Sequence, residues 1–154
     1  MDYLDTSYVV ALAVETDANH EAALALERRV KDPVVSELVV VETYTYFSRV
    51  LALEAAGSTQ DFEIIVEAMA RYALRRSGAR IVGMDADVLL EEAKQYAPRI
   101  RLKTLDLLHL LAARQIGAQR IVTLDEEYAR RIREAGGELG LEAVAPDSPA
   151  VMHG

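Results

Sequence analysis

The chain has 154 residues, of which 51% are hydrophobic, and this is enough for one domain with its own core. It has no cysteine, which excludes disulfides, zinc–thiolate sites and thiol catalysis, and its three histidines, His20, His109 and His153, are too scattered for a histidine metal cluster. The formal net charge of −8 argues against a broadly nucleic-acid-binding surface, although net charge does not describe one cleft.

Nothing in the sequence indicates export or membrane insertion. No apolar stretch approaches the roughly 18 residues that a membrane span needs. The opening "MDYLDTS" lacks the basic start and apolar run of a signal peptide. We therefore expect a soluble protein of the cytoplasm.

Short apolar strands alternate with helices along the chain. We expect strands at 2–4, 33–36, 79–84, 120–124 and 141–144. We expect helices at about 6–14, 19–31, 36–53, 59–76, 86–96, 104–116 and 126–135. Ser36 can cap the third helix, Ser58 or Thr59 the fourth, and Gly117 ends the sixth. The stretch "YAPRIRLKT" between the fifth and sixth helices is expected to be an extended connection.

This alternation predicts an α/β domain with a parallel sheet covered on both faces and right-handed crossovers. We expect one domain over residues 1–145 and a poorly ordered tail over 146–154. In such sheets function belongs at the carboxyl ends of the strands, beside the topological switch point.

Several acids are expected at that edge. Asp5 follows the first strand and Asp125 the fourth, so they lie about 5 Å apart if these strands are neighbours. Asp106 lies in the first turn of the helix before the fourth strand, which starts at the same edge. Glu42 lies six residues beyond Ser36, about 9 Å along a helix that begins there, and its side chain is long enough to reach back.

Asp85 also follows a strand, but the third strand would be an outer one. Two strand spacings, about 10 Å, would then separate it from the first strand. We interpret Asp85 as a helix cap or a first-turn acid.

Each of the other acids has a structural alternative. Asp5 could cap the first helix, and Glu42 could be a solvated residue or pair with Arg49. Asp106 could serve the helix dipole in its first turn. Thr123 and Glu126 form a T-x-x-E capping box, which would leave Asp125 as a first-turn acid only. Together these alternatives do not explain why the acids share one edge, and clustered oxygen ligands without His or Cys suit Mg²⁺ or Mn²⁺.

Four segments carry a family resemblance: "YLDTS", "SELVVVETYTYF", "LKTLDLLHLLAARQIGA" and "RIVTLDEEYAR". In this order and at these spacings they resemble the PIN-domain ribonucleases, especially the VapC-type toxins of toxin–antitoxin pairs. The resemblance runs from Asp2 to about Val144, and its one departure is the plain apolar stretch Val39–Val41, which does not touch the acids. It implies a three-layer α/β/α domain with a five-stranded parallel sheet in the order 3-2-1-4-5.

The resemblance also implies Mg²⁺- or Mn²⁺-dependent hydrolysis of phosphodiester bonds in single-stranded RNA. Asp5, Asp106 and Asp125 would hold the metal, with Glu42 as a ligand or a water-orienting acid, and one or two ions remain possible. Supporting roles would fall to the hydroxyls of Thr6, Ser7 and Thr123 and to His109, which invites a general-base role but which we expect to be packed or hydrogen-bonded. The candidate RNA contacts are Arg99, Arg101 and Lys103, although a solvated basic connection explains them equally well.

Two kinds of partner follow from the same resemblance: a second copy of the chain and a VapB-like antitoxin whose tail enters the active-site groove. The helix around "FEIIVEAMARYAL" carries Phe62, Ile65, Met69 and Tyr72 at helical spacing, mostly for core packing. Tyr44 and Tyr46 could stack on bases, but they are more readily explained as core.

Three rival interpretations remain. A phosphoacceptor receiver domain would want adjacent acids after the first strand and a lysine after the fifth, but no lysine follows Lys103. A dehalogenase-type phosphatase would want D-x-D, which "DYLD" does not supply. The third is a non-catalytic PIN-like module that binds RNA or protein, and the four intact acids argue against it.

Overall fold

The computed structural model describes residues 1–53 and 59–147 of the chain. Strands and helices alternate as predicted. In order they are β1 (Asp2–Leu4), α1 (Thr6–Ala13), α2 (His20–Glu27), β2 (Pro33–Val35), α3 (Glu37–Ala52), α4 (Thr59–Arg76), β3 (Arg80–Ile81), α5 (Ala86–Ile100), α6 (Thr104–Ile116), β4 (Arg120–Val122), α7 (Glu126–Leu139) and β5 (Glu142–Val144).

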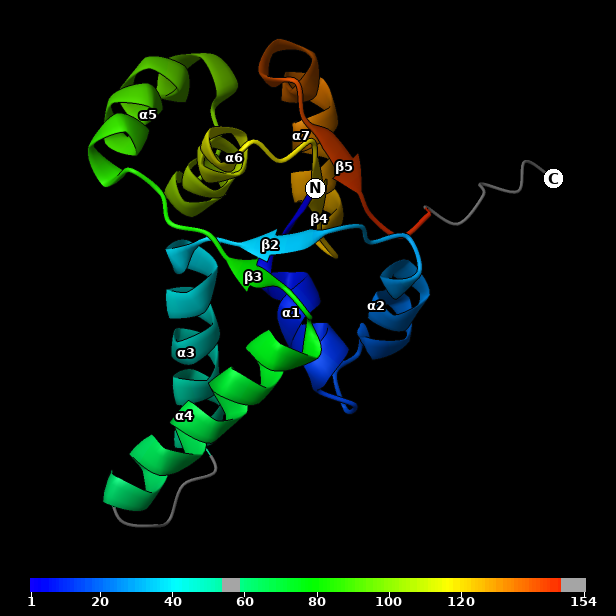
Figure 1. The fold of residues 1–154 in the computed structure, drawn as a ribbon, viewed down its shortest axis with the longest axis vertical. Coiled ribbons are helices and arrows are strands. Elements are labelled where there is room, and N and C mark those ends of the chain that lie inside the picture. The colour runs from blue at the N-terminus through cyan, green and yellow to red at the C-terminus, as the bar shows by residue number, and fades with distance from the viewer. Residues whose placement is uncertain (54–58, 148–154) are drawn as a thin grey trace, which may run out of the picture.

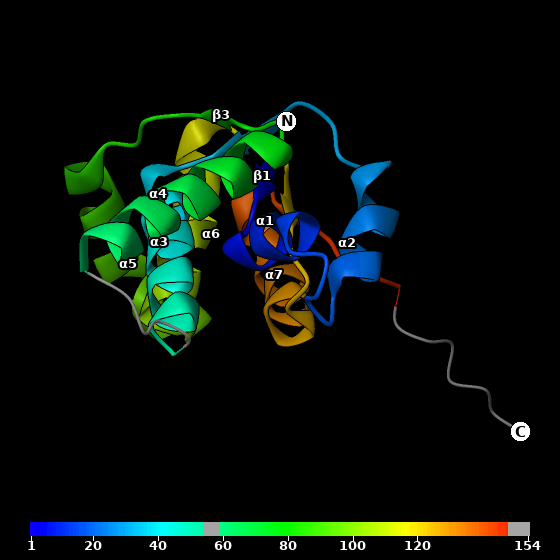
Figure 2. The same ribbon diagram turned by 90° about the horizontal axis from the view of Figure 1, so that it is seen from below.

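The five strands form one parallel sheet in the order β3-β2-β1-β4-β5, which confirms the predicted order. Helices α1 to α4 lie on one face of this sheet and α5 to α7 on the other, giving three layers (Figure 1). Seen from below, α3 and α4 pack as a pair beside α1 (Figure 2). The chain therefore crosses the sheet between β3 and β4, and β1 and β4 flank the switch point.

The central strand β1 sets the position of the functional edge. All three of its residues are buried, as expected for a strand covered on both faces. Leu4 is in register with Val122 of β4, and the backbone N–H of Asp5 donates to the carbonyl of Val122 at 2.9 Å. The residues that follow β1 and β4 therefore leave the sheet side by side.

The predicted extended connection after residue 96 is wrong over most of its length, because α5 continues through Pro98 to Ile100. Tertiary contacts explain this. Ile100 is buried, and the guanidinium of Arg131 donates to the carbonyls of Ile100 and Arg101, which are end groups of the helix. Only residues 101–103 separate α5 from α6.

Helix α7 also outruns its prediction, since it continues past Ala135 to Leu139. Gly136 is tolerated there because it packs closely against the start of β5: a Cβ at this position would lie 2.1 Å from the carbonyl oxygen of Leu141. Gly140, at φ +67°, takes the left-handed conformation that ends the helix.

Several elements are shorter than predicted, α2 and β3 by the most residues. Helix α2 ends at Glu27, because the chain turns there and the backbone N–H of Lys31 donates to the carboxylate of Asp2 at 2.7 Å. Strand β3 keeps only Arg80 and Ile81, both exposed at the sheet edge. The break before α4 and the tail from residue 148 fall outside the described residues, so the cap at Ser58 and the poorly ordered tail stay predictions.

Among the described residues, no helix combines the length and the apolar character that a membrane crossing requires.

Candidate active site

The carboxylate of Asp5 is held by hydroxyl groups. Ser7 Oγ and Thr123 Oγ1 both donate to Asp5 Oδ2, at 2.6 and 2.8 Å. The two hydroxyls in turn accept backbone N–H groups, Ser7 Oγ from Leu124 and Thr123 Oγ1 from Asp125, both at 3.1 Å. Although Asp5 stands at the start of α1, its side chain makes no capping hydrogen bond. The capping alternative for Asp5 is therefore wrong, and its carboxylate joins the ends of β1 and β4.

Asp125 uses one carboxylate oxygen to cap a helix, and its other oxygen is available for a ligand. Its Oδ1 accepts the backbone N–H of Tyr128 at 2.9 Å, so Asp125 is the N-cap residue of α7. The predicted capping box does not form, because the hydroxyl of Thr123 is turned to Asp5. The side chain of Asp125 is exposed, and from the described part of the chain no hydrogen bond reaches its Oδ2.

Asp106 lies half-buried in the first turn of α6. Its carboxylate takes no hydrogen bond or ion pair from residues 1–53 or 59–147, whereas its backbone carbonyl accepts the Tyr128 hydroxyl at 3.1 Å and so ties α6 to α7. Burial raises the pKa of Asp106, and the negative charges of Asp125 and Asp5 raise it further. The charges of Asp5 and Asp125 therefore act on the carboxylate of Asp106.

Glu42 approaches this edge from α3. Its Oε2 accepts two hydrogen bonds, from Thr6 Oγ1 at 2.6 Å and from His109 Nε2 at 2.5 Å. Burial raises the pKa of Glu42, but the hydrogen bonds from His109 and Thr6 more than offset it and hold the pKa below its usual range. Glu42 thus pairs with the buried His109, and the structure shows no ion pair between it and Arg49 in the described residues.

The donor set suits a hard divalent cation. All four acids offer oxygen, and the charges of Asp5 and Asp125 disfavour a further negative charge on Asp106, a repulsion that positive charge at this edge would relieve. Within the described ranges, no three Asp, Glu or His side chains are arranged closely enough to hold a metal ion. The residues fit Mg²⁺ or Mn²⁺ in type and charge, and binding would require their side chains to converge.

A hollow of about 420 Å³ adjoins the acids. Asp106 and Asp125 line it together with Arg101 and Lys103, two of the three predicted RNA contacts. Arg99, the third, instead pairs with Glu138 and lines a neighbouring hollow.

Sequence reasoning missed two residues of this region, Arg131 and Tyr128, which also line the hollow. Arg131 lies there because it binds the end of α5, and the sequence did not predict that end. Tyr128 reaches Asp106 only through the packing of α7 against α6.

The other candidates have structural roles. Asp85 caps α5 by accepting the backbone N–H groups of Asp87 and Val88, both at 3.1 Å, which confirms its interpretation as a cap. Tyr44 and Tyr46 are half-buried against the core.

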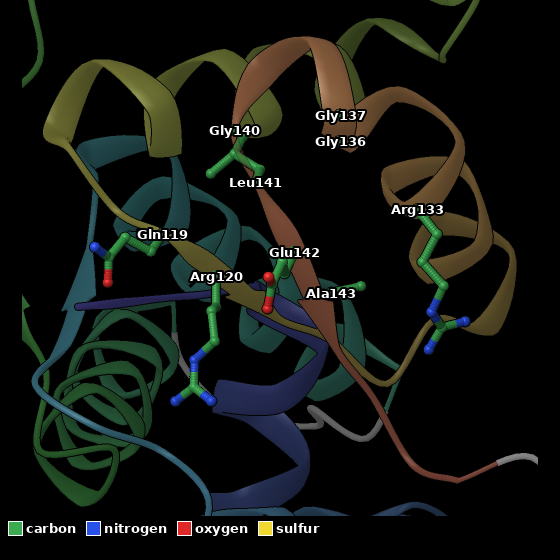
Figure 3. A pocket seen from close by; sticks show the side chains of 9 residues that line it. All are labelled: Gln119, Arg120, Arg133, Gly136, Gly137, Gly140, Leu141, Glu142 and Ala143. Atoms are coloured by element: carbon green, nitrogen blue, oxygen red, sulfur yellow. The ribbon is translucent and has the colours of Figure 1, made fainter.

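A larger hollow, of about 780 Å³, lies at the opposite edge of the sheet, where β4 and β5 begin (Figure 3). None of the candidate acids lines it. Its residues are Gln119, Arg120, Arg133, Gly136, Gly137, Gly140, Leu141, Glu142 and Ala143.

The family model of the PIN domain matches residues 3–134. A search of curated proteins finds no match.

Solved structures share the fold. The VapC20 toxin of Mycobacterium tuberculosis, described as cleaving the sarcin–ricin loop, has 23% identity and a TM-score of 0.59, over 84% of this chain and 94% of that one. FitAB bound to a DNA fragment has 18% identity and a TM-score of 0.65, over 99% and 100%. VapBC2 of Rickettsia felis, bound to promoter DNA, has 18% identity and a TM-score of 0.61, over 96% and 100%. At these identities the likeness concerns the fold.

Proposed function

This chain belongs to the PIN domain family, and we propose that it is an endoribonuclease that uses Mg²⁺ or Mn²⁺ to hydrolyse phosphodiester bonds of single-stranded RNA. One observation carries the proposal. Among the described residues, Asp5 accepts hydrogen bonds from neutral hydroxyls only, and burial together with the charges of Asp125 and Asp5 raises the pKa of Asp106. Carboxylates that repel one another in this way favour a bound divalent ion.

The residues divide the work as follows. Asp5, Asp106 and Asp125 would hold the ion, and Ser7 and Thr123 orient the carboxylate of Asp5 for it. When bound, such an ion supplies Lewis acidity toward a phosphoryl oxygen and toward water.

Glu42 lies at the side of this group, with one oxygen fixed by Thr6 and His109 and its pKa lowered, so it is a charged acceptor able to orient a water molecule for in-line attack or to contribute to metal binding.

RNA would approach through the hollow beside the acids. Arg101 and Lys103 line it, and guanidinium and ammonium groups bind phosphate oxygens. A basic rim next to an acidic centre lets a chain with a net charge of −8 bind a polyanion locally.

We further propose that the protein is the toxin of a toxin–antitoxin pair, acts in the cytoplasm and is neutralised by a VapB-like antitoxin. Supporting this, structures named FitAB and VapBC2 share the fold. An apolar hollow of about 480 Å³ also borders Glu42 and would accept apolar antitoxin side chains. Its apolar lining includes Leu38, Val41, Tyr46, Met84 and Leu105.

Self-association is proposed through α4. Of the predicted stripe, Phe62 and Met69 pack against the core, while Ile65 and Tyr72 stay exposed beside Ile64. We expect the mass of a homodimer in light scattering. A clean monomer at micromolar concentration would refute the association.

The test of the activity is cleavage of a labelled single-stranded RNA with and without Mg²⁺ or Mn²⁺. Asp125→Asn is compared with Asp85→Asn, because both residues cap helices and asparagine keeps the cap in each. We expect metal-dependent cleavage that survives Asp85→Asn and fails in Asp125→Asn. RNA binding without cleavage under any metal would favour the non-catalytic module instead.

A further inference from the structure

A chain of buried polar groups runs through the core to Glu42. The hydroxyl of Tyr3 lies 2.6 Å from Ser36 Oγ and 2.7 Å from His109 Nδ1. The other ring nitrogen of His109 lies 2.5 Å from Glu42 Oε2. These residues come from four places in the fold: Tyr3 from β1, Ser36 from the end of β2, Glu42 from α3 and His109 from α6. Ser36 and Tyr3 are fully buried and His109 is 2% exposed.

This arrangement departs from what local preferences favour. Ser36 stands at the N-cap of α3, yet its hydroxyl makes no capping hydrogen bond and is hydrogen-bonded to the hydroxyl of Tyr3 instead. Buried polar groups cost stability unless every one is paired, and a phenylalanine and a leucine would fill the positions of Tyr3 and His109 without that requirement. A conflict between local and global preference of this kind is typical of functional sites.

The chemistry of the partners decides which group donates and which accepts in each of these hydrogen bonds. A carboxylate can only accept, so His109 Nε2 carries the proton and donates to Glu42. In the neutral ring Nδ1 then accepts from the Tyr3 hydroxyl, which accepts from Ser36. A doubly protonated ring would reverse the two outer bonds and leave the bond to Glu42 unchanged. In both states Tyr3 fixes the orientation of the ring.

We propose that Tyr3 and His109 are positioning residues for Glu42. They hold Oε2 inward, and they leave Oε1, which no hydrogen bond from the described residues reaches, for the reaction. Thr6 assists from α1 through the same oxygen. This role rests on the proposed function, in which Glu42 orients water or supports the metal ion. Partners of this kind typically contribute about 10–100-fold to the activity or metal affinity of the group they orient.

The first arm of the test needs no activity. The ¹⁵N shifts of the His109 ring are recorded by NMR in metal-free protein, at a pH where the ring is neutral, and are assigned with His109→Gln. We expect the Nε2-protonated tautomer in both the unsubstituted protein and Tyr3→Phe, because Glu42 accepts from Nε2 in each. In Tyr3→Phe the ¹⁵N shift of the unprotonated Nδ1 should change, because Nδ1 then has no donor. Tyr8→Phe is the matched control, since Tyr8 is a buried tyrosine of α1 outside the chain of hydrogen bonds. An unchanged ring in Tyr3→Phe would overturn the proposal.

The second arm is a double-mutant cycle on RNA cleavage. Tyr3→Phe should lower kcat about 10-fold with the KM for RNA unchanged. In the Glu42→Gln background the same change should have almost no further effect, because Tyr3 acts only through Glu42. Equal losses in both backgrounds would show a general effect on the fold and would overturn the proposal.

A rescue separates hydrogen bonding from packing. His109→Leu removes the donor to Glu42, whereas His109→Gln keeps an amide N–H that can donate to Oε2. We expect Gln to recover part of the kcat that Leu loses, and equal activity of the two variants would contradict the positioning role. If the unsubstituted protein cleaves no RNA, the proposed function fails, and the NMR arm still decides whether Tyr3 orients His109.

Discussion

An aspartate lies at each end of strand β1, and the two have opposite kinds of partner. Asp2, at the amino end, is 1% exposed and receives two hydrogen bonds from the guanidinium of Arg120, at 2.8 and 2.6 Å, and one from the backbone of Lys31. Asp5, at the carboxyl end, receives only hydroxyl hydrogen bonds from the part of the chain that the structure describes, and the nearby acids add further negative charge.

The difference shows what each end is for. At the amino end the protein supplies its own cation, so the buried charge is paired and the contact serves the fold. At the carboxyl end it supplies neutral donors and gathers more carboxylates, an arrangement that costs stability unless a cation arrives from solution. We interpret the first as structural and the second as the candidate catalytic centre.

The largest expected effects come from replacing each of the two aspartates by asparagine: one substitution should remove activity and the other should remove stability. Asp5→Asn should lower RNA cleavage by more than about 100-fold, since even outer partners of a metal contribute about 10–100-fold, with little change in the melting temperature. Asp2→Asn should instead lower the free energy of unfolding by about 3 kcal/mol, the cost of breaking a buried ion pair. Denaturant unfolding and a cleavage assay under native conditions measure the two quantities.

The contrast would be broken by the reverse pattern. Full activity in Asp5→Asn, or an Asp2→Asn variant that keeps its stability and loses cleavage, would mean that the two ends of β1 have been assigned wrongly.

The basic residues beside the carboxyl end of β1, Arg101 and Lys103, can be tested as contacts for RNA. Neutralising Arg101 and Lys103 with glutamine should weaken RNA binding and flatten its dependence on salt. The log–log slope should fall by about 0.7 for each RNA phosphate that the protein no longer neutralises. The matched control is Arg133→Gln, which removes charge beside the hollow at the opposite edge. A slope unchanged by the double substitution would count against the rim as the route for RNA.

The smallest effect concerns Asp106. Because its pKa is raised in the folded protein, its charge opposes folding above that pKa, and the penalty disappears as the pH falls toward the ordinary value of 3.8. Asp106→Asn should therefore raise the melting temperature in EDTA at neutral pH, by roughly 2–4 °C if the penalty is about 1 kcal/mol.

Two further measurements of the melting temperature, at lower pH and with Mg²⁺, extend that experiment. The gain from Asp106→Asn should shrink as the pH is lowered, and Mg²⁺ should stabilise the unsubstituted protein but not the variant. Asp85→Asn, at the other helix cap, should show neither effect. An Asp106→Asn variant that is less stable in EDTA at neutral pH would contradict a penalty from the buried, repelled charge of Asp106.

The apolar pattern predicts the strands but does not show that β1 and β4 are neighbours. The family resemblance supplied that neighbourhood, and with it the strand order was predicted correctly. The sequence placed Asp5, Asp106 and Asp125 at one edge because a residue that ends a strand or starts a helix is located by the chain itself. It also separated Asp85 as a cap on an outer strand.

Contacts between distant segments escaped prediction. The hydroxyl of Ser36 was expected to cap α3, and it bonds to Tyr3 instead. The fifth helix was expected to end at about Tyr96, and the contacts of Ile100 and Arg131 carry α5 on to Ile100. In each case a tertiary partner outweighs a local preference, and a single sequence does not reveal the partner.

A calorimetric titration of the purified, metal-free protein with Mn²⁺, beside Asp5→Asn and Asp2→Asn, tests directly whether the carboxyl end of β1 holds a metal ion. We expect saturable binding in the unsubstituted protein and in folded Asp2→Asn, and its loss in Asp5→Asn. Equal binding in all three, or none in the unsubstituted protein, would contradict a metal site at the carboxyl end of β1.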